Sequence, residues 1–466
     1  MTRCHKPILS VPPLQVVIPF DGFMKQMSSQ GLKGLHPMKK VISLAVLLIF
    51  LMSCNLPNVP IPTEEATPIT NLSGQQGPKQ VAQPTIEAVT PSPTPQNITF
   101  SVGPDQAPVY PKGLTIIPDE HTTIMPPAPG SDMYLVFAAN MQSENGTGGP
   151  VVLETKDLKT FTFATGYSSP IMTAPFALST CKASFDPEFD LNYTGPGSVV
   201  QDPTRPAGNL IMIYEAENHC PGGVWQHFFY ATVGFARSSD NGKTWPAPVD
   251  SELGGPDRYP ILKGSTAEPA MAETPPVQMG DALPSAFVDR NFLYVTYLFA
   301  GPGGDGQIRV ARAKLGSSNQ LDFKKWYNGA FSQLGIGGLD SGVLPLVVCQ
   351  GQNMAQISYD DALGLYMLTF VCKSRADQAA WYFSTATSLE RQDWTIPKII
   401  ENSQLPMTGP CGKNDTGKLF DGWYPSFMSP GAAAGHLSKT GFVFFNDGCN
   451  SGPRTFMSRT FTITGP

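Results

Sequence analysis

Residues 237–248 read RSSDNGKTWPAP, and this short polar stretch indicates the fold of the whole chain. Its key residues follow the spacing S-x-D-x-G-x-T-W: Ser238, Asp240, Gly242 and Trp245. The short carboxylate of Asp240 can accept hydrogen bonds from backbone amides a residue or two further on. Gly242 adopts a positive φ angle at no steric cost, and Trp245 can bury a large ring where the next strand begins. The stretch therefore predicts a structural turn between two β-strands, not a catalytic site.

The same spacing resembles the Asp box of sialidases and related β-propellers, in which the box is a peripheral turn. The resemblance therefore implies a β-propeller fold, and it does not by itself imply a function.

Five short apolar runs recur along the chain, and a second strand-like run follows each of them. They are DMYLVFAAN from Asp132, NLIMIYEAEN from Asn209, NFLYVTYLFA from Asn291, GLYMLTFVC from Gly364 and TGFVFFNDG from Thr440. Their starts lie roughly 73 to 82 residues apart, which is the signature of a repeat architecture. No helical periodicity appears, and Gly, Pro, Asn and Asp punctuate the runs as they do between strands.

These repeats predict an all-β fold, a five-bladed β-propeller with four-stranded blades over residues 99–466. We expect the residues around Thr99 to Val102 to pair with the last blade and close the ring. A β-sandwich is one alternative, but it does not predict five repeats of this length. A six-bladed sialidase-like propeller is another. Only five units are found, however, no arginine triad can be identified, and DRYPILK (257–263) matches the sialidase Arg-Ile-Pro motif poorly.

The first 98 residues differ from this body. Residues 1–37 have no globular pattern, and we expect translation to begin at Met38. In residues 38–53, two lysines precede an apolar run of about a dozen residues, which is too short to span the ~30 Å core of a bilayer. It has the length of the apolar part of a signal peptide. Residues 54–98 are rich in Pro, Thr, Gln and Ser, a composition that does not fold and serves as an extended spacer.

Leu51-Met52-Ser53-Cys54 resembles the lipobox of bacterial lipoproteins, in which the cysteine becomes a lipidated N-terminus. Met52 departs from the small residue usual there, and the alternative is an ordinary signal peptide with an incidental cysteine. The resemblance implies an exported protein that Cys54 anchors to the outer face of the bacterial cell membrane or to the outer membrane.

The formal net charge is −6, and the body has no basic cluster, which argues against nucleic acid as a partner. No C-x-x-C or H-x-x-x-H spacing occurs, so we expect no zinc site. We expect a monomer without a cofactor, and a central cation remains open.

Three segments carry a second resemblance: GPGSVVQDP with GNLIMIYEAE (195–217), GDALPSAFVDRNFLYVTY (280–297) and WYPSFMSP (423–430). They resemble the five-bladed propeller glycosidases of the arabinanase, invertase and mannoside-phosphorylase groups, over most of residues 119–466. The resemblance implies a carbohydrate ligand and an active-site face. In each blade of those enzymes, the innermost strand begins on the active-site face, and the loop between the second and third strands lies on the same face. Those enzymes take a catalytic trio from their first three blades, and no motif here matches that trio residue by residue.

Glycoside cleavage needs two carboxyl groups beside the scissile bond. The carboxylates assigned to the active face are Asp119, Glu120, Asp186, Glu188, Asp190, Glu215, Glu217, Glu273, Asp281 and Asp421. Alternation places Glu215 and Glu217 on one face of their strand and Tyr214 on the other. The predicted catalytic residues are Glu217, Asp281, Asp186, Asp190 and Glu273, with Glu217 and Asp281 the strongest. For each one alone, a solvated loop charge is the alternative.

Histidines, aromatic residues and further carboxylates on the same face are the candidates for sugar binding. They are Asp119, His121, His219, Trp225, Asp421, Trp423 and Tyr424. The aromatic rings can stack on sugar rings, with core packing as the alternative. For the two histidines, the alternative is an ordinary surface imidazole.

Six cysteines lie in the body, and an even number suits an exported protein. They predict the disulfides Cys181–Cys220, Cys349–Cys372 and Cys411–Cys449, because each pair occupies the two active-face loops of one blade. Free buried thiols are the alternative.

The sequence thus predicts a cell-surface lipoprotein whose propeller binds a glycan and hydrolyses it with paired carboxylates. The alternatives are a lectin-like propeller that binds without cleavage, a sialidase-like propeller, and an adhesion protein whose face binds another protein. All remain open because propellers host unrelated functions. Acidic side chains with raised pKa values in a central funnel would favour the enzyme. The sugar, its linkage and the stereochemical outcome are left open.

Overall fold

A computed structural model describes most of the chain beyond residue 96. The described residues are 97–112, 114, 117–140, 149–174, 189–218, 229–247, 255–264, 278–300, 306–344, 351–375, 378–405, 422–448 and 454–465. The predicted leader, Cys54 and the spacer lie outside them. Every regular element that is described is a β-strand, so the all-β class is confirmed. The described residues contain no helix of the length and apolarity that a bilayer crossing requires.

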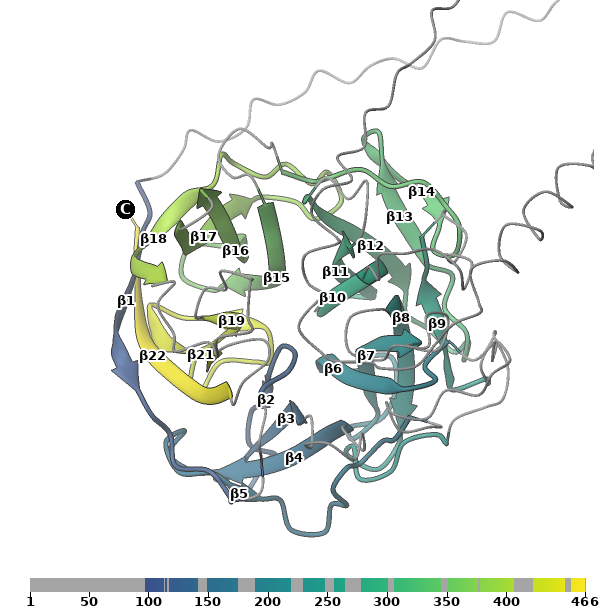
Figure 1. Ribbon diagram of the computed structural model, residues 1–466, viewed down its shortest axis with the longest axis horizontal. Coiled ribbons are helices and arrows are strands. Elements are labelled where there is room, and N and C mark those ends of the chain that lie inside the picture. Colours follow the sequence, from purple (N-terminus) through teal and green to yellow (C-terminus); the bar gives the residue numbers. More distant parts are fainter. Residues whose placement is uncertain are drawn as a thin grey trace, which may run out of the picture. The chain divides into compact units, whose positions relative to one another are not determined.

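The antiparallel pairings of the described strands form five units around a central axis (Figure 1). The first unit is β2 (Thr123–Met125), β3 (Tyr134–Asn140), β4 (Gly149–Thr155) and β5 (Thr162–Phe163). The second is β6 (Tyr193–Gln201), β7 (Leu210–Asn218), β8 (Phe229–Ser238) and β9 (Arg258–Leu262). The third is β10 (Gln278–Asp289), β11 (Phe292–Ala300), β12 (Ile308–Lys314), β13 (Lys324–Tyr327) and β14 (Ala330–Leu334).

The fourth unit is β15 (Gly351–Asp360), β16 (Leu365–Arg375), β17 (Gln378–Ala386) and β18 (Lys398–Leu405). The fifth is β19 (Trp423–Met428), β21 (Thr440–Gly448), β22 (Arg454–Thr464) and β1 (Thr99–Gln106), and the short β20 (His436–Leu437) pairs with β15. The five predicted apolar runs are the second strands β3, β7, β11, β16 and β21. The third unit departs from the expected four strands, because β14 extends its described part.

The hydrophobic core is divided into five clusters among the described residues, and each cluster is shared by two neighbouring units. Between the first and second units, for example, Phe137 packs with Met212. The first and fifth units share a cluster as well, in which Val136 lies with Phe444. Each sheet is therefore covered on both faces by its neighbours, and the ring of units is closed.

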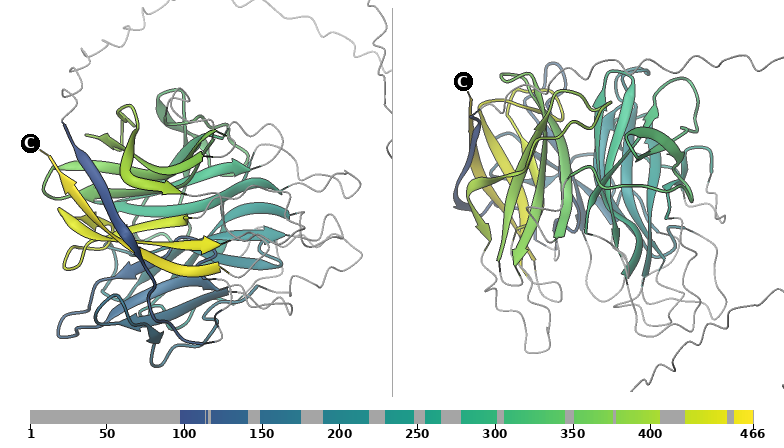
Figure 2. Two further views of the ribbon diagram at one scale, coloured as in Figure 1. Left: turned by 60° about the vertical axis from the view of Figure 1, so that its left-hand side comes forward. Right: turned by 90° about the horizontal axis from the view of Figure 1, so that it is seen from above.

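Strand β1 completes the fifth unit, although it comes from the other end of the described chain. It pairs antiparallel with β22, with Thr99 opposite Thr464 and Val102 opposite Phe461. Figure 2 shows the two strands side by side at the edge of the body. The expected pairing of Thr99 to Val102 with the last unit is thus observed.

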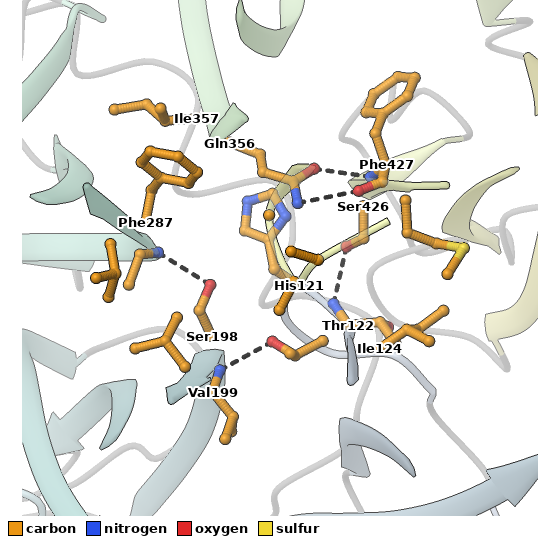
Figure 3. Close-up of a pocket in the computed structure, with 18 of the residues that line it drawn as sticks. His121, Thr122, Ile124, Ser198, Val199, Phe287, Gln356, Ile357, Ser426 and Phe427 are labelled. Atoms are coloured by element: carbon orange, nitrogen blue, oxygen red, sulfur yellow. Dashed lines mark hydrogen bonds between the residues drawn. The ribbon is translucent and has the colours of Figure 1, made fainter. Parts of the chain in front are cut away.

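Hydrogen bonds between the inner strands also join the units, and Figure 3 shows several of them. In four of these bonds a side-chain oxygen accepts from a backbone amide of the next unit. The acceptor and donor pairs are Thr123 Oγ1 with Val199 N (2.9 Å), Ser198 Oγ with Ala286 N (2.9 Å), Gln356 Oε1 with Phe427 N (2.7 Å) and Ser426 Oγ with Thr122 N (2.8 Å). Between the third and fourth units, Thr296 Oγ1 donates to the Ala355 carbonyl (2.7 Å).

A register shift interrupts each of the four longer inner strands, just before the residue that makes these bonds. The shifts lie at Pro196/Ser198, Ala282/Ser285, Asn353/Gln356 and Trp423/Ser426. Three of the bulges contain a residue with positive φ: Leu283 at 54°, Met354 at 51° and Tyr424 at 55°. Because a bulge re-aims the side chains and amides beside it, these bulges shape the centre of the ring.

The turn at residues 238–245 is closed by its own polar groups. Asp240 Oδ1 accepts from the amide of Thr244 (3.0 Å), and Ser238 Oγ accepts from the amide of Gly242 (3.0 Å), whose φ is 79°. Trp245 starts no strand; its indole Nε1 donates to the Gly242 carbonyl (2.9 Å) and folds the ring back over the turn.

We predict that Phe100→Ala lowers the free energy of unfolding by about 3–5 kcal/mol, because it empties a site of that size in a close-packed core. Phe100 is buried, and its ring contacts Phe383 of the fourth unit and Phe427 and Phe461 of the fifth. Denaturant unfolding measures the loss.

The control is Thr99→Ala at the exposed neighbouring position, which should change stability by less than about 0.5 kcal/mol. Equal small losses in both variants would show that β1 does not hold the ring together.

Candidate active site

Four acidic residues from two segments lie close together where the inner strands begin. Asp119 and Glu120 lie in the segment that leads into β2, and Glu215 and Glu217 belong to β7. All four are buried, with exposed fractions of 6%, 2%, 3% and 8%. We call these four residues the acid cluster. Such burial is unusual for carboxyl groups and needs a physical explanation.

The strand geometry accounts for the placement of the two β7 residues. Glu215 lies opposite Gly195 of β6, and Glu217 lies opposite Tyr193. Successive side chains alternate between the faces of a strand. Tyr214 accordingly points the other way, where its hydroxyl donates to Asp190 Oδ2 (2.9 Å). This is the arrangement that the alternation along β7 predicts.

Gly195 is the residue that lets Glu120 reach this face. A Cβ atom at position 195 would lie 2.7 Å from Cγ of Glu120 and 2.5 Å from the hydroxyl of Tyr193. Neither approach is possible for a real side chain, so the glycine creates the space in which Glu120 meets Glu215.

The carboxyl group of Glu215 lies close enough to those of Glu120 and Glu217 to share a proton with either of them. Its Oε2 atom also accepts from the backbone amide of Leu283 (2.5 Å), which the bulge of β10 turns toward it. A hydrogen bond between two carboxyl groups requires a proton on one of them. The chain Glu120–Glu215–Glu217 therefore holds protons that isolated carboxylates would have released.

Burial raises the pKa of Glu120 well above its ordinary value, and the negative charges of Glu215, Asp119 and Glu217 add to the shift. Burial is also the main reason that the pKa of Glu215 is raised, followed by the charge of Glu217, while the amide of Leu283 opposes the shift. Like charges in one desolvated space cannot all ionise. The acid cluster can therefore supply a proton at a pH where exposed carboxyl groups cannot.

Tyr193 lies against Asp119. Its hydroxyl is 3.2 Å from Asp119 Oδ2 and 3.2 Å from the carbonyl of the same residue. Burial raises the pKa of Tyr193 well above its ordinary value, with the charge of Asp119 as the next cause. The phenol thus stays protonated and donates toward Asp119.

His121 follows Glu120 in the chain and is buried. Burial lowers its pKa to about 4, against a small opposing effect of the Pro425 carbonyl, so the imidazole is neutral at pH 7. Its ring centroid lies 6.2 Å from that of Tyr424 in an edge-on arrangement. Trp423 is half-buried next to Tyr424, with their ring centroids 6.1 Å apart.

Asp281, a leading catalytic candidate from the sequence, is held in a different environment. Its Oδ2 atom accepts from Lys325 Nζ (2.9 Å), and neither side chain is exposed. Lys325 also lies 3.6 Å from Asp340 Oδ2, and Arg309 Nε is 2.7 Å from Asp340 Oδ1. Burial raises the pKa of Asp281, and Lys325 opposes that shift. This ion-pair network favours a structural role for Asp281, not that of a proton donor.

Asp190 also pairs with a cation. Its Oδ2 atom accepts from Arg258 Nε at 2.7 Å and from the Tyr214 hydroxyl, and the ion pair is buried. The sequence pattern could not distinguish Asp190 and Asp281 from Glu217, because their cationic partners come from distant strands.

Several predicted site residues lie outside the described residues, and their roles stay predictions. They are Asp186, Glu188, His219, Trp225, Glu273 and Asp421. Cys372 is disulfide-bonded, and its pairing with Cys349 stays a prediction because Cys349 is not described. The other two predicted disulfides, Cys181–Cys220 and Cys411–Cys449, also lie outside the described residues.

Glu120 and Glu215 are the residues that sequence reasoning left out of its catalytic set. Glu215 had a signal, since it stands two positions before Glu217 on the same strand face. Glu120 had none beyond its place at the start of an inner strand, because its contact with Glu215 depends on how the first two units pack.

Within the described parts of the chain, no group of three or more His, Cys, Asp or Glu residues has the arrangement of a metal site. The buried arginines whose side chains are described each face a carboxylate: Arg237, Arg258, Arg309 and Arg459. None of these four is an unpaired cation of the kind that would bind a substrate carboxylate.

No protein-family model matches the chain, and no curated protein matches it. Solved structures with a similar fold include the catalytic domain of a GH62 α-L-arabinofuranosidase from Coprinopsis cinerea. The sequence identity is 13% and the TM-score is 0.41, and the alignment covers 78% of this chain and 97% of that chain. An α-L-arabinofuranosidase from Podospora anserina, in complex with cellotriose, has 13% identity, coverages of 78% and 96%, and a TM-score of 0.42.

A family 117 glycoside hydrolase from the marine bacterium Zobellia galactanivorans has 10% identity, coverages of 78% and 90%, and a TM-score of 0.41. At identities and TM-scores this low, the activity of this chain rests on its own side chains.

We predict that Lys325→Met destabilises the protein by about 3–5 kcal/mol, because it leaves the buried carboxylate of Asp281 without its cation. Adding Asp281→Asn should recover part of that loss, since the unpaired charge is then removed. Urea unfolding of the wild type, both single variants and the double variant gives the coupling between the two side chains.

If the effects of the two substitutions simply add, Asp281 is not held by Lys325, and its place among the catalytic candidates would be restored.

Proposed function

We propose that this protein is a glycoside hydrolase whose acid cluster performs the proton transfers of the reaction. The observation that supports this best is the burial of Glu120, Glu215 and Glu217 in one space, where burial and mutual repulsion raise the pKa of Glu120 and of Glu215. Carboxyl groups of opposite protonation state are what glycoside cleavage requires.

The four residues of the acid cluster divide into a proton-holding part and an accepting part. Glu217 is the most exposed member of the chain of three and is the residue we assign to protonate the leaving-group oxygen. The Glu120–Glu215 pair supplies the proton reserve behind it. Asp119, which accepts from Tyr193, is the carboxylate partner that activates water or attacks the sugar.

The same observation favours hydrolysis over the lectin-like alternative. A binding site gains nothing from several buried carboxyl groups that must share protons, whereas a proton-transfer site depends on them. The sialidase-like alternative has no support in the described residues, where the buried arginines face carboxylates of the protein itself.

We predict that Glu217→Gln and Glu120→Gln each lower turnover by about 10²–10⁴-fold, because each substitution removes a proton that the reaction uses. Glycan binding should survive, since the amide keeps the shape of the side chain. The assay is a screen of the purified protein against aryl glycosides, furanosides and polysaccharides, with Glu154→Gln, at a half-buried position outside the acid cluster, as a control.

The pH profile tests the same assignment. The proton reserve works only while Glu120 is protonated, so turnover should fall as the pH rises through the raised pKa of Glu120. Glu215→Gln removes one of the negative charges that raise the pKa of Glu120. The alkaline limb should therefore move to lower pH in this variant. Binding without turnover in the wild type would favour the lectin, and unchanged turnover in the glutamine variants would exclude these residues.

We also propose that the protein is held at the bacterial surface by a lipid on Cys54, with carbohydrate and membrane as its partners. Support comes from the lipobox-like Leu51–Cys54, the charged and apolar residues before it, and the Pro/Thr-rich spacer after it. A spacer of this kind would hold the body away from the membrane surface.

We expect Cys54→Ser to move the protein from the membrane fraction to the soluble fraction of cells, as fractionation and immunoblotting would show. Ser53→Ala, which leaves the cysteine in place, is the control. Persistent membrane association of Cys54→Ser would refute the lipid anchor.

A further inference from the structure

The centre of the ring contains a cavity of about 220 Å³, drawn in Figure 3. It begins at His121, beside the acid cluster where the inner strands start. It ends among residues that lie at or beyond the other ends of those strands: Gln201, Val288, Met428, Ala433, Ala434 and Gly435. The cavity thus runs from the acid cluster toward the opposite face of the ring.

Most polar side chains on the wall of this cavity already have partners. Thr123, Ser198, Gln356 and Ser426 accept the hydrogen bonds that join the units. The rest of the wall includes apolar side chains such as Ile124. These groups leave little for a charged ligand to bind.

Two consecutive wall residues, His121 and Thr122, are exceptions. Neither ring nitrogen of His121, nor Oγ1 of Thr122, makes a hydrogen bond of ordinary geometry in the described part of the chain, although the Pro425 carbonyl lies near the imidazole. All three atoms are buried. His121 is 2% exposed and Thr122 is 5% exposed. Buried polar atoms of native proteins almost always have a partner, and ordered water supplies it where protein does not.

The cavity has room for that water. At ~30 Å³ for each molecule in the liquid, its volume corresponds to about seven waters. A neutral imidazole both donates and accepts, and a hydroxyl does the same, so the two residues can anchor a chain of waters in either direction.

The chain of waters would end next to the proposed catalytic residues. Tyr424 lies edge-on to His121, and it is also close enough to Tyr193 to raise the pKa of that phenol. Tyr193 in turn contacts Asp119. Tyr424 and Tyr193 therefore lie between the cavity wall at His121 and the acid cluster.

We propose that the central cavity is a solvent conduit, in which water molecules bound to His121 and Thr122 connect the acid cluster with the opposite face of the ring. The role of the conduit in catalysis rests on the proposed function. A glycan bound over the acid cluster would block water from that face of the ring, and the hydrolytic water would then enter from the opposite face through the cavity. Small residues at the far end, Ala433, Ala434 and Gly435, keep that end open.

The test places a thiol inside the cavity and a plug at its far end. Ala286 lines the cavity, and Ala286→Cys keeps the backbone amide that bonds to Ser198. The folded protein is treated with methyl methanethiosulfonate, a small neutral thiol reagent, and modification is followed by mass spectrometry. Wild-type protein treated in parallel reports any reaction of the native cysteines.

The plug is Ala433→Trp, added to Ala286→Cys. The matched control is Ala362→Trp, at an exposed turn that follows β15 on the same side of the ring but does not line the cavity. We expect the introduced thiol to react while the protein stays folded. The plug should slow this reaction on the order of tenfold, because a bulky side chain then occupies the open end of the cavity. The control substitution should leave the rate unchanged.

A thiol that reacts only in denaturant, or at the same rate with and without the plug, would overturn the proposal. These results need no turnover, so they are independent of the proposed function. With a substrate in hand, Ala433→Trp should lower kcat and leave KM unchanged, while Ala362→Trp changes neither. A plugged protein with unaltered kcat would show that the conduit does not feed the reaction.

Discussion

The whole structure depends on one constraint: each unit is apolar on both faces of its sheet, and only a closed ring can bury both. In the second unit, Met212 packs toward the first unit and Ile213, the next residue of β7, toward the third. An open row of such sheets would leave two large apolar faces in water. The cluster shared by the first and fifth units removes both of them. Ring closure also explains why β1 is added to β22, because Phe100 then fills the space between the fourth and fifth units.

Ring closure brings the starts of the inner strands together, and that convergence creates the acid cluster. Glu120 approaches Glu215 from a different unit, across a position that only glycine can occupy. The bulge of β10 adds a backbone amide from a third unit. Moving ionised carboxyl groups into such a space is costly, and keeping protons on them lowers the cost. The chemistry we assign to the site is therefore a direct consequence of how the units pack.

Buried acids of two kinds occur in the described residues, and their partners separate them. Asp190 and Asp281 each lie against a buried cation, and each pair links two segments of a single unit. Glu120 and Glu215 lie against other acids, which stabilises the protonated form. The first kind is suited to holding the fold, and the second is suited to moving protons.

The all-β class and the five second strands can be read from the sequence alone. A strand's alternation and its punctuating turns are local properties that repeat every unit. The sequence also shows that Glu215 and Glu217 share a face, because that follows from the period of one strand. Which carboxyl groups meet depends on how the units pack, which brings Glu120 to Glu215 and pairs Asp281 with Lys325. Such contacts link residues far apart in the chain, and no local pattern records whether a buried acid will find a cation or another acid.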